Sequence, residues 1–195
     1  MSFASRVARP LCLVAVASML CLAAMAIPAP SAAGTVTFDG LVAASTSYAE
    51  DGALLVTTGS FNRSDYGSPS MFSGQTSAVI TLTLDGGGPF NLVSMDVREL
   101  NDTVGAQTIV FEGTLAAGGT VSTTVDTDGA CCSSALAYGF ETVAFPASFS
   151  NLVAVSWDHV NPEAFAVYDN IVVAEQATPV EATTWGAIKV LIPVR

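Results

Sequence analysis

Positive charge and histidine are both scarce in this chain of 195 residues. Six lysines and arginines stand against 17 aspartates and glutamates, and with one histidine the formal net charge is −11 at pH 7. Such a surface repels the phosphate backbone of nucleic acids, so we expect no nucleic-acid partner. The acidity suits a hard cation such as Ca²⁺, and it is equally explained by solubility alone.

The scarcity of histidine also limits the catalytic mechanisms that are open to the chain. A serine hydrolase needs a base beside its nucleophile, but His159 lies in an expected turn and no Gly-x-Ser-x-Gly motif is present. One histidine is also too few for a Cys/His zinc site. We therefore expect a protein that is not an enzyme. The least favoured alternative is a glycan hydrolase or lyase that uses two of the abundant carboxylates, because no spacing marks such a pair.

Cysteine is rare as well, with four residues in the chain. Cys12 and Cys21 belong to the apolar leading segment, whereas Cys131 and Cys132 are adjacent in a glycine- and serine-rich loop. In an oxidising compartment, adjacent cysteines can form a small strained ring or can pair between molecules. We expect Cys131 and Cys132 to form a disulfide in one of these ways, with a local structural role rather than redox chemistry.

The first 33 residues have the composition of an export signal. Arg6 and Arg9 give a positive start, an apolar run covers residues 11–27, and small residues end the segment at Ala33. We expect cleavage after Ala33, with cleavage after Ala26 as the second choice and a retained membrane anchor as the alternative. The mature protein would then be secreted or held at the cell surface, with no stable membrane span.

Short runs of alternating apolar and polar residues recur between turn signals through the remainder of the chain. Residues 77–84 and 152–158 are the clearest, because apolar residues alternate with polar or small ones. The expected strands cover residues 35–39, 53–59, 77–84, 90–99, 106–113, 120–126, 138–145, 152–158 and 165–173. No helical stretch separates them, so we predict an all-β fold, an antiparallel jelly-roll-like β-sandwich of about eight to nine strands. The sandwich would span residues 34–174, and a linker and short C-terminal tail would follow over residues 175–195.

The last expected strand carries a carboxylate among core-type residues. Regular strand alternation places Asp169 on the same face as Val167 and Ile171. A carboxylate in a core must be neutral, hydrogen-bonded or bound to a cation. The alternatives are that Asp169 only accepts backbone N–H bonds, or that Tyr168 and Val172 face inward instead.

One hard cation would neutralise Asp169 if the first and last strands are neighbours, as they often are in a sandwich. Asp39 ends the first expected strand and is the natural partner, with Glu50 and Asp51 as further oxygen ligands. The sequence therefore predicts a structural Ca²⁺ site at Asp39 and Asp169 that ties the two ends of the domain together.

Aromatic residues make up only 8% of the chain, so few side chains are available to stack on a sugar ring. Residues 62–77 form an expected long polar loop, and loops of this kind are often functional. Tyr66 and Phe72 lie in this loop, and we predict that they bind a ligand. Trp157 continues an apolar stripe and is expected in the core instead.

Five short segments give the chain a family resemblance. They are Val36-Thr37-Phe38-Asp39, Tyr48-Ala49-Glu50-Asp51-Gly52, Val110-Phe111-Glu112-Gly113, Phe149-Ser150-Asn151-Leu152-Val153-Ala154-Val155 and Val167-Tyr168-Asp169-Asn170-Ile171-Val172-Val173. Over residues 34–174 the chain resembles the jelly-roll ectodomains of PEP-CTERM-type exported bacterial proteins, which are akin to carbohydrate-binding modules. The resemblance implies a secreted β-sandwich in which an acidic residue of the last strand, here Asp169, helps to hold a structural Ca²⁺ ion. The C-terminal sequence departs from the PEP-CTERM anchor, with no Pro-Glu-Pro motif or membrane helix, so sorting by that route is not expected.

Together these features predict a secreted or cell-surface, non-catalytic β-sandwich that binds an extracellular glycan or matrix, with Ca²⁺ as a structural cofactor. One alternative is a structural or adhesive component of the cell envelope that has no small ligand. The other is the glycan-cleaving enzyme considered above, which would lose turnover when a single carboxylate is replaced.

Overall fold

The computed structural model describes residues 33–65, 67–75, 77–100, 105–131, 139–159 and 165–176. They form eleven strands: β1 (Ala33–Val36), β2 (Ser45–Glu50), β3 (Ala53–Ser64), β4 (Ser70–Ser73), β5 (Ile80–Leu84), β6 (Phe90–Glu99), β7 (Thr108–Leu115), β8 (Thr120–Asp126), β9 (Glu141–Ala144), β10 (Leu152–His159) and β11 (Ala166–Glu175). Their pairings are antiparallel, so the predicted all-β antiparallel fold is confirmed. Within the described ranges, no helix is long and apolar enough to cross a membrane.

All nine expected strands are present, and two strands that the sequence pattern does not predict bring the total to eleven. β2 is exposed or only half-buried along its length, so it lacks a clear apolar alternation. β4 has only four residues and lies inside the stretch expected to be a loop. Both additions flank β3, which is itself longer than expected because it continues to Ser64.

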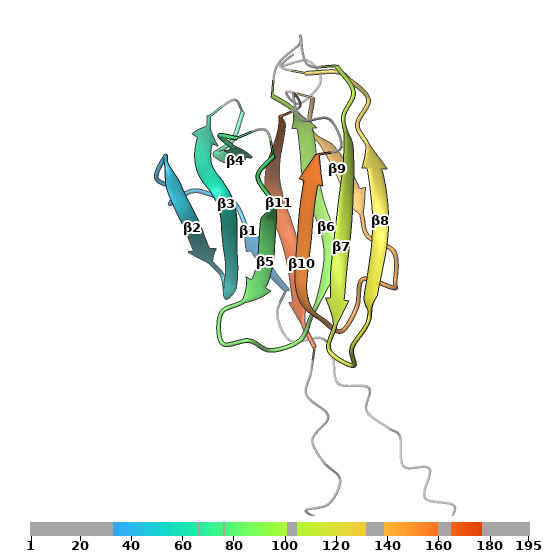
Figure 1. The fold of residues 1–195 in the computed structure, drawn as a ribbon. Helices are drawn as coiled ribbons and strands as arrows, with labels where there is room; N and C mark the ends of the chain where they lie inside the picture. Colours follow the sequence, from blue (N-terminus) through green and yellow to red (C-terminus); the bar gives the residue numbers. More distant parts are fainter. Residues whose placement is uncertain are drawn as a thin grey trace, which may run out of the picture.

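The strands form two layers that face each other (Figure 1). The front layer contains β2, β3, β5, β10, β7 and β8 in that order, and the back layer contains β4, β11, β6 and β9, with β1 beside β11. β3 belongs to both layers, because residues 53–57 pair with β5 and residues 61–64 pair with β4. A single bridge between Leu152 and Phe90 joins β10 to β6. The architecture is a jelly-roll-like β-sandwich.

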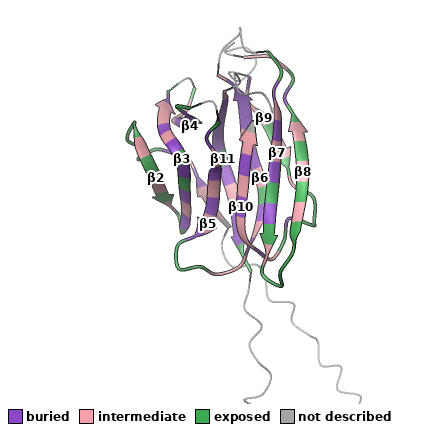
Figure 2. Cartoon of the chain, viewed as in Figure 1, coloured by how far each residue is buried: buried purple, intermediate pink, exposed green. Residues whose placement is uncertain are grey.

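The core lies between the layers and is built from side chains at alternate strand positions (Figure 2). Trp157 is its largest residue, and its ring centroid lies 5.6 Å from that of Phe111 and 5.6 Å from that of Tyr168. Phe145 packs edge-on against Phe111 at 5.0 Å. Full burial of one such large apolar side chain contributes about 1.5–3 kcal/mol. Trp157 therefore has the core position expected from the sequence.

An irregularity in β11 changes which of its residues face the core. Tyr168 faces the core and so does Ile171, an odd spacing that a regular strand does not allow. The register with β6 shifts between Asp169 and Val172, and Asn170 adopts a left-handed backbone conformation with φ of 46°. The expectation that Asp169 shares a face with Ile171 is therefore wrong, because the extra residue inverts the alternation. Asp169 is instead on the face opposite to Tyr168.

Several sequence predictions fall outside the described residues. They concern the export signal up to residue 32, the C-terminal tail from residue 177, and the side chains of Tyr66 and Cys132. These remain predictions, as do the domain boundaries.

Candidate functional site

Asp169 is buried on β11, with 2% of its surface exposed, and hydrogen bonds reach its carboxylate. The Ser68 hydroxyl donates to Oδ2, and the main-chain N–H of Asn170 donates to Oδ1 at 2.8 Å. Burial raises the pKa of Asp169, these two hydrogen bonds oppose the rise, and the nearby carboxylates of Asp96 and Asp39 add to it. Asp39 is thus close enough to act on Asp169 electrostatically, while protein donors already stabilise the Asp169 carboxylate.

The other carboxylates predicted to share this cation make their own contacts. Asp39 is exposed, its Oδ2 lies 3.3 Å from the Thr37 hydroxyl, and its carbonyl oxygen accepts a bond from Arg63. Glu50 Oε2 accepts the main-chain N–H groups of Thr37 and Phe38 at 2.7 and 2.9 Å. Glu50 therefore fixes the chain that follows β1. A shared Ca²⁺ ion at Asp39 and Asp169 remains a prediction.

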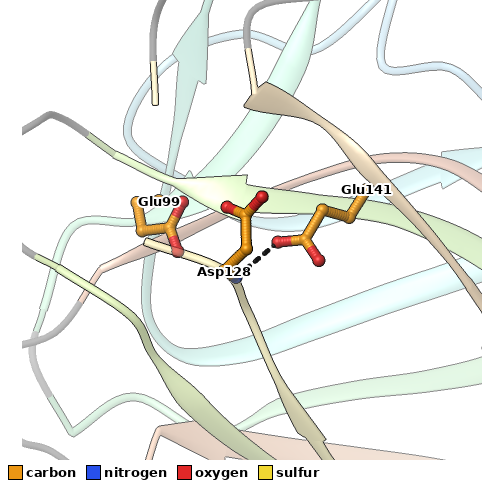
Figure 3. A group of neighbouring side chains, drawn as sticks. All are labelled: Glu99, Asp128 and Glu141. Carbon is orange, nitrogen blue, oxygen red and sulfur yellow. Dashed lines mark hydrogen bonds between the residues drawn. The ribbon is translucent and has the colours of Figure 1, made fainter. Parts of the chain in front are cut away.

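A different group of carboxylates converges at one end of the sandwich (Figure 3). Glu99 is the last residue of β6, Asp128 follows β8, and Glu141 is the first residue of β9. One carboxylate oxygen from each lies within 4.8 Å of the other two. We call Glu99, Asp128 and Glu141 the acidic trio. Among the described residues, it is the group of three side chains with the spacing needed to share an ion.

Hydrogen bonds hold the acidic trio in place, but one carboxylate oxygen of Glu99 accepts none from the described residues. Glu99 is fully buried, and its Oε1 accepts the Thr127 hydroxyl and the Gly129 N–H, the latter at 2.8 Å. Its Oε2 is also buried and has no hydrogen-bond partner among the described residues. The N–H of Asp128 donates to Glu141 Oε1 at 2.8 Å, as Figure 3 shows. The trio therefore contains a buried carboxylate oxygen that has no hydrogen-bond partner in the described part of the protein.

The electrostatics of the acidic trio are unfavourable when no cation is present. Burial raises the pKa of Glu141, and the charges of Asp128 and Glu99 raise it further, against the lowering effect of the Asp128 N–H. Two like unit charges about 5 Å apart near a protein surface repel each other by about 3 kcal/mol. No sequence pattern marks this cluster, because its members come together only through the pairing of β6 with β9 and the turn after β8.

A depression of about 250 Å³ lies on the front layer, between β5, β10 and β7. Its lining residues are Val79, Val110, Glu112, Ser156, Trp157 and Asp158. The strand register explains the arrangement, because Ser156 lies opposite Glu112 on one side and opposite Thr81 on the other. Asp158 lies opposite Val110 in the next outward-facing row. These side chains alternate with core residues, so they point away from the core.

Of the predicted ligand-binding and disulfide residues, the structure describes Phe72 and Cys131. Phe72 is half-buried on β4 and paired with Val167, so it belongs to the back layer and not to the depression. Its partner in the prediction, Tyr66, lies outside the described residues. Cys131 is disulfide-bonded, but its partner cysteine is not among the described residues, so pairing with Cys132 remains a prediction. Its Sγ lies 3.3 Å from the carbonyl oxygen of Glu99, beside the acidic trio.

Comparison with protein-family models and with curated proteins gives no match for this chain. Among solved structures, it is similar to a family 11 carbohydrate-binding module from Clostridium thermocellum bound to a β-1,3-1,4-mixed-linked tetrasaccharide. The identity is 16%, the coverage is 75% of this chain and 98% of that chain, and the TM-score is 0.41. The C-terminal family 22 carbohydrate-binding module of Clostridium thermocellum Xyn10B is 13% identical, with coverages of 75% and 95% and a TM-score of 0.39. A family 30 carbohydrate-binding module is 14% identical, with coverages of 78% and 91% and a TM-score of 0.35.

These similarities are distant, with every TM-score below 0.5. The fold assignment therefore rests on the strand pairings of this chain. Its function is argued from its own side chains.

Proposed function

We propose that the chain is a secreted or cell-surface, non-catalytic β-sandwich that binds an uncharged glycan in the depression on the front layer. The observation that carries the proposal is the composition of this depression, where two carboxylates and a hydroxyl lie beside two valines. Glycan recognition needs this combination, because a sugar presents hydroxyl groups at its edges and C–H groups on its faces.

The polar residues supply acceptors for sugar hydroxyls. Glu112 and Asp158 each offer two carboxylate oxygens, and Ser156 can both donate and accept a hydrogen bond. Bonds from hydroxyls to carboxylates are stronger than bonds between neutral groups. Val79 and Val110 provide apolar surface that can cover the C–H face of a sugar. The Trp157 ring packs in the core, so the aliphatic side chains would make this contact.

The charge of the depression narrows the class of glycan. None of the side chains that line it is basic, and the chain as a whole has a net charge of −11. A polysaccharide that carries carboxylate or sulfate groups would be repelled at this site. The depression is smaller than a typical small-molecule pocket, which favours a short stretch of a polymer laid across the sheet.

The same two carboxylates bear on the enzyme alternative. Glu112 and Asp158 project from neighbouring strands, and a glycosidase needs two carboxyl groups that flank the bond to be cleaved. A general acid, however, is kept protonated by a dry environment, and Glu112 is exposed on an open sheet. This difference favours binding without cleavage.

Calorimetric titration of the purified protein with neutral and acidic polysaccharides, in the presence of Ca²⁺, tests the proposal. We expect at least one neutral polysaccharide to bind and the acidic ones not to bind. Asp158→Asn and Glu112→Gln should each weaken binding about tenfold, which corresponds to about 1.4 kcal/mol. Asp51→Asn is the charge-matched control, because Asp51 lies in an exposed turn between β2 and β3.

Two outcomes would contradict the proposal. If no neutral polysaccharide binds, the structural or adhesive role in the cell envelope becomes the better explanation. If a polysaccharide is cleaved and Glu112→Gln abolishes the cleavage, the protein is a glycan-cleaving enzyme.

A further inference from the structure

We infer that the acidic trio is a Ca²⁺ site that joins the two layers of the sandwich at the edge formed by β8 and β9. The inference is independent of glycan binding, because the trio lies at the ends of β6 and β8 and the start of β9. The depression lies on another part of the molecule, between β5, β10 and β7.

The first argument comes from Glu99. Its side chain is fully buried, and its two oxygens differ in their hydrogen bonding. Thr127 and Gly129 both donate to Oε1, whereas Oε2 is buried and has no donor among the described residues. A buried carboxylate oxygen without a partner is strongly unfavourable, and it is stabilised by a proton or by a cation. Figure 3 shows the Glu99 carboxylate facing the other two members of the trio.

The second argument is the convergence of the three carboxylates. Ca²⁺ binds oxygen ligands at about 2.3–2.6 Å, so two ligands of one ion are at most about 5 Å apart. The trio oxygens lie within 4.8 Å of one another, which meets this limit. Asp128 is exposed, so water has access to complete the coordination shell.

The ligand chemistry selects a hard cation over a soft one. All three side chains offer carboxylate oxygens, which suit Ca²⁺ rather than zinc or copper. Cys131 lies beside Glu99 but is disulfide-bonded, so it offers no thiolate. Ca²⁺ tolerates irregular geometry and bidentate carboxylates, whereas Mg²⁺ requires near-octahedral geometry and sheds water reluctantly.

The position of the acidic trio gives the ion its role. β8 ends the strand order of the front layer and β9 ends that of the back layer, and each pairs on one side only in the described chain. Asp128 extends from β8, and Glu141 begins β9. An ion shared with Glu99 would therefore join the two edge strands where no backbone ladder does so in the described ranges. It would also fix both ends of the segment that carries the disulfide-bonded Cys131.

The competing calcium site is the predicted one at Asp39 and Asp169. There the Asp169 carboxylate already accepts bonds from Ser68 and Asn170, so each of its oxygens has a protein donor. The two sites are far enough apart in the chain to be tested by separate substitutions.

The test is thermal unfolding of the full protein, first stripped with EDTA and then titrated with CaCl₂, together with calorimetric titration of Ca²⁺. We expect saturating Ca²⁺ to raise the melting temperature by about 5 °C or more. Asp128→Asn and Glu141→Gln should each abolish at least half of this rise and weaken Ca²⁺ binding about tenfold or more. The amide oxygen introduced by Asp128→Asn can still accept the Ala130 N–H that now bonds to Asp128 Oδ1 at 2.6 Å, so folding should persist.

Two matched controls have the same change of charge. Asp126→Asn removes an exposed carboxylate two residues from Asp128, and it should leave the Ca²⁺-dependent rise unchanged. Asp169→Asn should also leave it unchanged. Loss of the rise in Asp169→Asn with retention in Asp128→Asn and Glu141→Gln would overturn the inference in favour of the predicted site.

Two further results would overturn the inference. One is the absence of any Ca²⁺-dependent rise in the wild-type protein, and the other is Mg²⁺ binding as tight as Ca²⁺ binding. Glu99→Gln provides a second line of evidence. Its amide keeps an acceptor for Thr127 and Gly129, so the variant should fold but respond to Ca²⁺ much less than the wild type.

Discussion

Asp169 and Glu99 are both almost completely buried, yet their surroundings differ. Each oxygen of Asp169 has a donor, from Ser68 on one side and Asn170 on the other. Glu99 has two donors on one oxygen and, within the described part of the chain, none on the other. Burial of a carboxylate is therefore not by itself a sign of a cation site. The distribution of donors over its two oxygens is the more informative feature.

The largest effect is expected for Glu99→Ala in the presence of saturating Ca²⁺. The substitution leaves the Thr127 hydroxyl and the Gly129 N–H without their acceptor, and the free energy of unfolding should fall by about 3 kcal/mol. Urea unfolding in CaCl₂ measures the change. Glu112→Ala removes an exposed glutamate and should stay within about 0.5 kcal/mol of wild type. Equal effects of the two substitutions would show that Glu99 contributes nothing as an acceptor.

A smaller effect is expected for Ser68→Ala. The hydroxyl donates to the buried carboxylate of Asp169, so its loss should destabilise the protein by about 1–2 kcal/mol. The control is Ser122→Ala on the exposed side of β8, which should change stability by less than about 0.5 kcal/mol. In the double variant with Asp169→Asn, the cost of losing Ser68 should shrink, because the group that it stabilises is no longer charged. An unchanged cost would mean that Ser68 acts through another contact.

The smallest effect is a pH dependence at Asp169. Burial raises its pKa above the ordinary value of 3.8, so its contribution to stability is fully present below that pH and is lost as pH rises through the raised pKa. Asp169→Asn cannot ionise and should lack this loss. Relative to the variant, the wild type should therefore become less stable as pH rises from about 4 to about 7, by less than about 1 kcal/mol. Urea unfolding at several pH values in EDTA measures the difference, and parallel curves would contradict the assignment.

Much of the fold could be predicted because strand alternation is a local property. Apolar residues at every second position revealed β5 and β10 without any knowledge of their neighbours. β2 and β4 are not predicted, because the first is exposed or only half-buried along its length and the second has four residues. The irregularity in β11 is not predicted. The sequence alone suggests a continuous alternation of inward and outward residues, and the left-handed conformation of Asn170 interrupts it.

The candidate sites were harder to predict, for a physical reason. Glu112 and Asp158 occupy outward positions of predicted strands, but only the register between β7 and β10 places them diagonally across the two strands, in successive outward-facing rows. The acidic trio depends on three segments that are distant in the sequence. A charge within an apolar run is visible in the sequence, so the sequence predicts a site at Asp169. A missing hydrogen-bond donor becomes visible only in the folded structure.

Because β3 runs through both layers, it affects how the protein unfolds. Its first half pairs with β5 in one layer, and its second half pairs with β4 in the other. Loss of the β3 hydrogen bonds in either layer therefore disturbs a strand that also belongs to the other layer. Partial opening of one half is therefore suppressed, and denaturation should follow a single cooperative transition in which every spectroscopic probe reports the same midpoint.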